Sequence, residues 1–451
     1  MQSAYRPEMP ASRFLVRLLM LFVVAQVLNH GAAAAVPVVL NGHWEGSMTS
    51  QGAQLPVSFD FVQSGSGIEG RFTSPTQRAM DYPLDTVNLS DSSIHFILGG
   101  GIAFDGEVTA EDITGAFKSE DASGSFTLKK KVKQELPYDV IDVTFSNGGV
   151  NLSGTLVSPR TPARHSAVVL LQGSGPETRW GTNRFIADRL AREGVAALIY
   201  DKRGSGASGG DWKTASFEDL ARDALSGVTL LRSRPDIDPA RIGLHGHSQG
   251  GIIAAIAASL APDKVAFIVA EDTIAGPVWE QDLYRTRNAL AQDFKPTEVE
   301  AAMRLYTLFI DVARGKRPYA ELEAASALAA KDKEPWFDSL GIPPRDSWLW
   351  QWYPKTGNLD TLDYWGRVKI PVLLVFGERD RLVPVDASIS KLEKALDKNG
   401  APYTALIAPA AEHNLTVHPE AGEPFFWWHV APGIIDTVVS WIKTSDISSV
   451  R

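Results

Sequence analysis

One short segment of this 451-residue chain has the residue types and spacing that make a serine hydroxyl a nucleophile. Residues Gly246–Gly250 read Gly-His-Ser-Gln-Gly, with Ser248 at the centre. They follow the short apolar run Ile242–Leu244 and open the Ala- and Ile-rich stretch Gly250–Leu260, a pattern typical of a strand that turns sharply into a helix. Glycines are needed two residues either side of the serine because a Cβ in so tight a turn would collide with its neighbours. We therefore predict that Ser248 is exposed at a helix N-terminus.

A serine hydroxyl needs a base to remove its proton, and in a chain of this order the base and its acid follow the serine. Three histidines lie downstream of Ser248, namely His413, His418 and His429. We choose His413 because it comes directly after the strand-like stretch Tyr403–Ile407, where a loop at the sheet edge would present it. The other two flank prolines and aromatic residues, which is typical of surface or packing positions.

The acid that completes this set is predicted to be Asp380. It lies in the loop beyond the strand-like run Val372–Phe376, and side chains of functional sites gather at the carboxyl ends of strands in open α/β sheets. The carboxylate would orient the imidazole and stabilise it when protonated. Two alternatives remain open: Glu378 could be the acid, and Asp380 could instead pair with Arg379 or Arg381.

Two backbone N–H groups are predicted to stabilise an oxyanion. The first belongs to Gln249, at a helix N-terminus that carries free N–H groups and partial positive charge. The second would come from the loop Gln172–Pro176, which follows the apolar run Ala167–Leu171. We assign it to Ser174, with Gly175 as the fallback, although an ordinary Gly/Pro turn would have the same composition.

The elements that must position these residues form an α/β pattern. Short, continuous apolar runs recur along the chain, as strands buried on both faces require. These runs are Ala167–Leu171, Val195–Ile199, Ile242–Leu244, Val265–Val269 and Val372–Phe376. Helical patterns lie between most of them, which predicts a mostly parallel sheet flanked by helices.

Residues 274–368 are too many for one crossover helix and are interpreted as a helical lid insertion. In it, Trp348, Trp350 and Trp352 would share one face of an extended segment and could line a pocket.

The N-terminal part of the chain has a different hydrophobic pattern. Within residues 36–132, apolar and polar residues alternate in short runs separated by Gly and Asn/Asp-Ser clusters, which predicts a small antiparallel β barrel or sandwich. No reactive constellation is found there. The catalytic domain would then occupy residues 133–451.

Residues 1–35 read as a targeting segment. Arg6, Arg13 and Arg17 precede the apolar stretch Leu18–Leu28, and four alanines follow at Ala32–Ala35. This order is typical of a cleaved signal peptide, and the apolar run is short of the roughly 20 residues that span a bilayer. We expect a periplasmic or secreted protein without stable membrane insertion.

Composition excludes several other classes of function. A net charge of −9 gives no basic field for nucleic acid, and the absence of cysteine excludes disulfides and thiolate chemistry. The glycine-rich run Gly204–Gly209 matches a dinucleotide-binding pattern only weakly, because no helix opens directly from it. No metal-ligand cluster and no cofactor motif stands out, so neither a metal nor a cofactor is expected.

Taken together and in this order, the motifs around Gln172, Ser248, Asp380 and His413, with the turn Tyr200–Gly204, resemble the α/β-hydrolase superfamily. The branch is similar to bacterial exported esterases and serine-aminopeptidase-like hydrolases, and the resemblance covers about residues 138–444. It implies an α/β-hydrolase fold and hydrolysis of carboxylic esters through an acyl-enzyme. The alternatives are an aminopeptidase or thioesterase acting on a small amide or thioester, or a non-catalytic cell-envelope binding protein.

Overall fold

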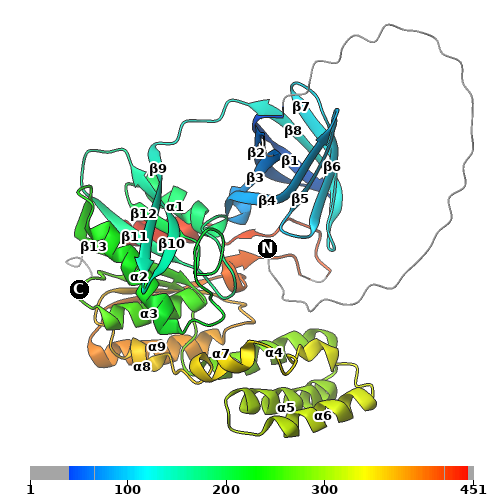
Figure 1. The fold of residues 1–451 in the computed structure, drawn as a ribbon, viewed down its shortest axis with the longest axis vertical. Helices are drawn as coiled ribbons and strands as arrows, with labels where there is room; N and C mark the ends of the chain where they lie inside the picture. The colour runs from blue at the N-terminus through cyan, green and yellow to red at the C-terminus, as the bar shows by residue number, and fades with distance from the viewer. Residues whose placement is uncertain (1–39, 66, 421, 445–451) are drawn as a thin grey trace, which may run out of the picture.

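The computed structural model describes residues 40–65, 67–420 and 422–444, and the predicted signal peptide lies outside these residues. The chain forms an N-terminal β barrel, a larger α/β part and a group of helices beside the latter (Figure 1). Within the described ranges, no helix is both long and apolar enough to cross a membrane.

The N-terminal part closes into an eight-stranded antiparallel barrel, because β1 pairs with both β2 and β8. The alternation seen in the sequence has its expected result: Leu55, Val57, Phe59 and Phe61 of β2 are all buried. Their rings and aliphatic groups meet those of the other strands inside the barrel, as Phe59 and Phe96 do at a centroid distance of 5.2 Å. The strands are β1 (Gly42–Ser50), β2 (Ala53–Ser64), β3 (Gly67–Ser74), β4 (Ala79–Ser90), β5 (Ser93–Leu98), β6 (Ile102–Val108), β7 (Asp112–Lys118) and β8 (Ser123–Lys131), with the 3-10 helix η1 (Pro75–Gln77) before β4.

The α/β part is built on an eight-stranded sheet of order β16-β15-β14-β13-β11-β12-β10-β9. The strands from β11 to β16 are parallel to one another, and the hairpin β9–β10 adds an antiparallel edge. The strands are β9 (Tyr138–Asn147), β10 (Val150–Pro159), β11 (His165–Leu171), β12 (Ala196–Tyr200), β13 (Ile237–His247), β14 (Ile268–Glu271), β15 (Val372–Gly377) and β16 (Tyr403–Ala408). The predicted α/β class with an N-terminal antiparallel domain is confirmed.

Helices cover both faces of this sheet, which explains why its strands are apolar on both sides. Along β11, Val169 and Leu171 pack with α2 and α3, whereas Val168 and Leu170 pack with α1 and α10. The flanking helices are α1 (Thr182–Arg192), α2 (Phe217–Arg232), α3 (Gln249–Leu260), α9 (Val385–Asn399) and α10 (Ile434–Thr444).

The long connection between β14 and β15 is helical, as predicted, and has a hydrophobic core of its own. We call it the helical insertion; it lies beside the α/β part in Figure 1. Its helices are α4 (Val278–Asp293), α5 (Pro296–Ala313), α6 (Tyr319–Lys331), α7 (Leu349–Thr356) and α8 (Leu362–Trp365).

The expectation that three tryptophans share one face of an extended segment is wrong. Trp350 and Trp352 lie within helix α7 and Trp348 caps it, so residues two apart point in nearly opposite directions. Trp350 packs edge-on against Phe309 of the insertion's core, at 5.5 Å between centroids. Trp352 meets Phe217 of α2 at 6.0 Å, on the other side. The aromatic residues join the insertion to the α/β part instead of forming one exposed stripe.

The barrel packs directly against the α/β part. Met80, in β4, and Gly181, at the start of α1, exchange two backbone hydrogen bonds of 3.3 and 2.9 Å. Trp427 of the α/β part reaches the barrel, where its indole N–H donates to the carbonyl of Ala53 at 3.1 Å and its ring meets Phe117 at 5.8 Å. The barrel is therefore held against the α/β part by contacts far in sequence from the linker, residues 132–137, that joins β8 to β9.

Candidate active site

Ser248 stands in the sharp turn between β13 and α3, as the sequence predicts. Its backbone has φ 53° and ψ −117°, a conformation that a non-glycine residue adopts only under strain. A Cβ on Gly246 would lie 2.1 Å from the carbonyl oxygen of Gly250, and a Cβ on Gly250 would lie 2.7 Å from another backbone oxygen. Both glycines are therefore required by close backbone contacts, and the turn that they allow carries Ser248, which is half-buried.

His413 and Asp380 lie together at the carboxyl edge of the sheet. His413 opens the 3-10 helix η3 (His413–Leu415) after β16, and Asp380 lies in the loop after β15. The imidazole Nδ1 donates to Asp380 Oδ2 at 2.7 Å. The other carboxylate oxygen accepts from the backbone N–H groups of Leu382 and Val383, at 2.7 and 2.9 Å. Asp380 is buried, and its two oxygens have partners that fix its orientation.

The alternatives left open by the sequence have other partners. Glu378 accepts from a backbone N–H of the neighbouring loop at 2.7 Å, and Arg379 pairs with Glu420 instead of with Asp380. His418 stacks on Trp428, with ring centroids 5.8 Å apart. Among the predicted base and acid candidates, only His413 and Asp380 are brought together.

The Ser248 turn and the His413 loop are neighbours. The ring of His247, the residue before Ser248, meets the ring of His413 at a centroid distance of 4.9 Å. In the part of the chain that the structure describes, no hydrogen bond joins the Ser248 hydroxyl to His413. Such serine–histidine contacts are often looser before a substrate binds.

A second buried carboxylate, Asp272, lies behind His413, and the sequence analysis missed it. It follows β14 and accepts from the backbone N–H of Gly377 at 2.8 Å. Burial raises the pKa of Asp272 to about 7; His413 opposes this shift and Asp380 adds to it. The signal in the sequence was an acidic pair, Glu271 and Asp272, at the carboxyl end of an apolar run.

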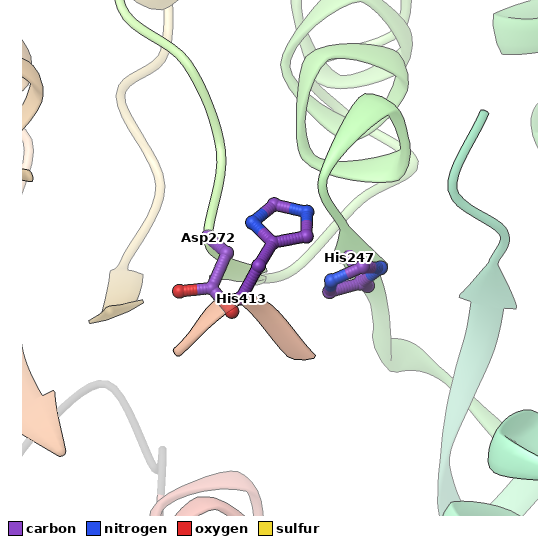
Figure 2. Close-up of side chains that lie close together, drawn as sticks. All are labelled: His247, Asp272 and His413. Atoms are coloured by element: carbon purple, nitrogen blue, oxygen red, sulfur yellow. The ribbon is translucent and has the colours of Figure 1, made fainter. Parts of the chain in front are cut away.

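Asp272, His247 and His413 form a cluster of side chains from three different segments (Figure 2). Each can offer one metal-ligand atom, and these atoms lie within 4.8 Å of one another. The Nδ1 of His413 is already bonded to Asp380, so a cation would have to take its Nε2. That nitrogen is the one a general base would use, and a metal here would compete with base chemistry.

The pKa values of the two histidines of this cluster are shifted in opposite directions. Burial alone would lower the pKa of His413, but the hydrogen bond and charge of Asp380, with the charge of Asp272, raise it above its ordinary value. Burial and the adjacent His413 hold the pKa of His247 well below its ordinary value. His247 therefore stays neutral while His413 accepts a proton readily.

The loop predicted to supply an oxyanion donor is held by a lysine of the turn Tyr200–Gly204, a residue to which the sequence alone gave no role in the site. The ammonium group of Lys202 donates to the carbonyls of Gly173 and Gly175, the latter at 3.0 Å, and to the side-chain oxygen of Gln249 at 3.1 Å. Because C=O and N–H of one trans peptide point in opposite directions, fixing the Gly173 carbonyl turns the N–H of Ser174 away from Lys202.

This loop also touches the Ser248 turn. A Cβ on Gly173 would lie 3.3 Å from Nδ1 of His247, so the loop and the turn approach closely. Gln249 is the first residue of α3, and its N–H has no acceptor within the helix. The loop that carries Ser174 thus touches the Ser248 turn, and Lys202 links this loop to Gln249.

With this geometry in view, residues 162–420 match the family described as "Serine aminopeptidase, S33", and the match covers more than half of the chain. The chain belongs to the serine aminopeptidase S33 family. The resemblance to α/β-hydrolases is confirmed. The S33 match includes Ser248, Asp380, His413 and the helical insertion, whereas all eight barrel strands lie before it.

The chain spans about half the length of the first curated relatives that it matches. The chain is 30% identical over 122 residues to the quorum-quenching protein AidA of Acinetobacter baumannii, covering 27% of this chain and 40% of that protein. It is 27% identical over 267 residues to the esterase EstD of Thermotoga maritima, covering 56% of this chain and 57% of that protein. An esterase structure from Pyrococcus furiosus aligns with 62% of this chain and 84% of its own, at 21% identity and a TM-score of 0.40.

Proposed function

We propose that this protein hydrolyses carboxylic esters of small molecules through an acyl-enzyme formed on Ser248. The observation that carries the proposal is the buried Asp380–His413 pair, 2.7 Å apart, beside the strained turn that presents the serine. A raised histidine pKa favours proton uptake from the hydroxyl, and a fixed carboxylate stabilises the imidazolium that results.

The reaction would proceed in two halves. Nε2 of His413 takes the hydroxyl proton as Ser248 Oγ attacks the ester carbon, and the N–H groups of Gln249 and Ser174 stabilise the oxyanion. The intermediate collapses to the acyl-enzyme, and His413 gives the proton to the departing alcohol. A water molecule then gives a proton to His413 and attacks the acyl carbon, which releases the carboxylic acid and returns the proton to Ser248. Asp380 orients the imidazole in both halves.

The contacts of the helical insertion support an ester substrate over a peptide with a free amino terminus. An aminopeptidase needs a carboxylate to bind the α-amino group, and α4 of the insertion carries the acidic side chains Glu280 and Asp282. Asp282 is engaged by Arg285 at 2.7 Å and by the Tyr353 hydroxyl at 2.8 Å. Glu280 pairs with a lysine of α9 at 3.3 Å. The name of the EstD relative, an esterase, agrees with this choice.

Covalent labelling tests the nucleophile directly. The wild-type protein is expected to react with a fluorophosphonate and to hydrolyse p-nitrophenyl esters, whereas Ser248→Ala should lose both activities and keep its melting temperature. Loss of a member of such a catalytic set slows turnover by several orders of magnitude. Ser259→Ala, in the same helix α3, is the matched control, since its hydroxyl bonds only a backbone carbonyl at 2.8 Å.

Substrate class is tested by comparing p-nitrophenyl esters of rising chain length with aminoacyl p-nitroanilides. Faster turnover of the esters is expected. Labelling of the Ser248→Ala protein would assign the nucleophile elsewhere, and preference for the anilides would favour the aminopeptidase alternative.

A further inference from the structure

One arginine of the barrel reaches into the candidate active site. Arg78 lies between η1 and β4 with a left-handed φ of 51°, and its side chain is buried. Its guanidinium contacts the carboxylate of Glu271, with Nη2 2.6 Å from Oε2, and donates from Nη1 to the carbonyl of Asn414 at 3.5 Å. Arg78 lies outside the residues that match the S33 family, so the barrel adds this side chain to the site.

The first contact supports the nucleophile turn. Glu271 is fully buried at the end of β14, and its backbone carbonyl accepts the N–H of Ser248 at 2.8 Å. Its second carboxylate oxygen lies 2.9 Å from Nε2 of His245 on β13. Burial alone would raise the pKa of Glu271, but Arg78 and His245 outweigh it and lower that pKa. Without Arg78, the buried carboxylate of Glu271 would lose its main compensating charge.

The second contact supports the histidine loop. Asn414 follows His413 and has φ 69° and ψ 14°, and Leu415 after it also has a positive φ. Two consecutive non-glycine residues in this region make a strained loop, which persists only where its surroundings hold it. Arg78 holds the carbonyl between them, and the Thr416 hydroxyl holds the carbonyl of His413 at 3.1 Å.

We infer that Arg78 is a positioning residue for the proposed ester hydrolysis, on which this inference rests. Its guanidinium holds Glu271, which bonds the backbone of Ser248, and the loop of His413 in fixed positions relative to each other. The barrel is then part of the working enzyme. The alternative is that Arg78 only attaches the barrel to the α/β part, as any interface ion pair would.

The interface offers a matched control for that alternative. Asp81, three residues after Arg78, pairs with the buried Arg184 of α1 at 2.9 Å. Both ion pairs join the same two parts of the molecule. Within the described part of the chain, Asp81 and Arg184 form no hydrogen bond or ion pair with Glu271 or the His413 loop. Asp81→Asn therefore weakens attachment without changing the support of the site.

The test compares Arg78→Gln, Arg78→Lys and Asp81→Asn in the full-length chain, by melting temperature, kcat and KM for a p-nitrophenyl ester, and the rate of fluorophosphonate labelling. A displacement of about 1 Å at reacting groups slows turnover roughly 10²-fold. We expect such a loss of kcat and labelling rate in Arg78→Gln with KM little changed, partial recovery in Arg78→Lys, and wild-type kcat in Asp81→Asn. Wild-type kcat in folded Arg78→Gln, or an equal loss in Asp81→Asn, would overturn the inference.

If Arg78→Gln fails to fold, the double variant R78Q/E271Q removes the uncompensated charge. It is expected to recover stability while turnover stays slow, and wild-type turnover in it would contradict the inference. Hydrogen exchange over residues 411–417 needs no substrate, so it separates this inference from the proposed function. Arg78→Gln should exchange faster there than Asp81→Asn, and equal exchange would reject the positioning role even if esters prove not to be substrates.

Discussion

At the scale of single residues, the protonation of His413 is expected to set the pH dependence of turnover. Only the neutral imidazole can accept the serine proton, so kcat/KM should rise with pH as His413 loses its own proton. Burial lowers the pKa of His413, but the raising effects of Asp380 and Asp272 are larger, so the pKa is raised overall. The midpoint of the rise in kcat/KM should therefore lie above the ordinary histidine value of about 6.5.

Asp380→Asn tests this assignment. The amide keeps the shape of the side chain but removes the charge that raises the histidine pKa, so the midpoint should move to lower pH and kcat should fall about 10⁴-fold. The measurement is the pH profile of kcat/KM. Glu378→Gln, two residues earlier in the same loop, should leave the profile unchanged, since Glu378 bonds the backbone N–H of Ala410 and not the imidazole of His413. An unmoved midpoint in Asp380→Asn would mean that another group is titrating.

Residue type and spacing were enough to predict that Asp380 and His413 would pair and that the His413 loop would lie near the Ser248 turn. Ser248, Asp380 and His413 each follow a strand-like run, and parallel strands bring their carboxyl ends to one edge. Asp272 and Lys202 were missed because a buried charge is recognised by what surrounds it, and no local pattern shows that an acid or a lysine will be enclosed. The same holds for the close approach of His247 to His413.

At the scale of elements, the loop after β11 depends on Lys202 for its shape. Lys202→Met keeps the length of the side chain and removes its hydrogen bonds to Gly173, Gly175 and Gln249. If the loop carries an oxyanion donor, kcat should fall by about 10²–10³-fold, as on loss of one such donor, with a smaller effect on KM. Lys264→Met, at an exposed lysine of the same part, is the control. Wild-type kcat in Lys202→Met would remove the loop from the mechanism.

The elements themselves differ in how far the sequence determines them. Strands such as β11 are predictable because burial on both faces demands an uninterrupted apolar run. The segment Trp348–Trp352 is not, because alternating aromatic residues fit either a strand or a helix that packs on two sides. Its helical form follows from contacts with Phe309 on one side and Phe217 on the other. Those partners are distant in the chain, so local periodicity could not reveal them.

At the scale of the whole molecule, the sequence predicted an antiparallel barrel or sandwich, but neither which of the two forms nor its purpose. Closure depends on the pairing of β1 with β8, which joins the two ends of the domain. The contact that suggests a purpose joins Arg78 to Glu271, 193 positions apart. Such distant pairings leave no periodic trace in a single sequence, and only the folded chain shows that the barrel and the α/β part share a buried interface.

That interface predicts that the two parts unfold together. Trp427 is the α/β part's anchor in the barrel, through its bond to Ala53 and its contact with Phe117. Trp427→Ala removes that anchor and should lower the free energy of unfolding by roughly 2–4 kcal/mol, somewhat less than the about 3–5 kcal/mol for a fully buried tryptophan, because Trp427 is only partly buried. Calorimetry should show one transition for the wild type and two for Trp427→Ala, because a weakened interface lets each hydrophobic core melt separately.

Trp428→Ala is the control. The ring of Trp428 stacks on His418 instead, so this variant should keep a single transition. Two transitions already present in the wild type would show that the interface does not couple the folding of the two parts.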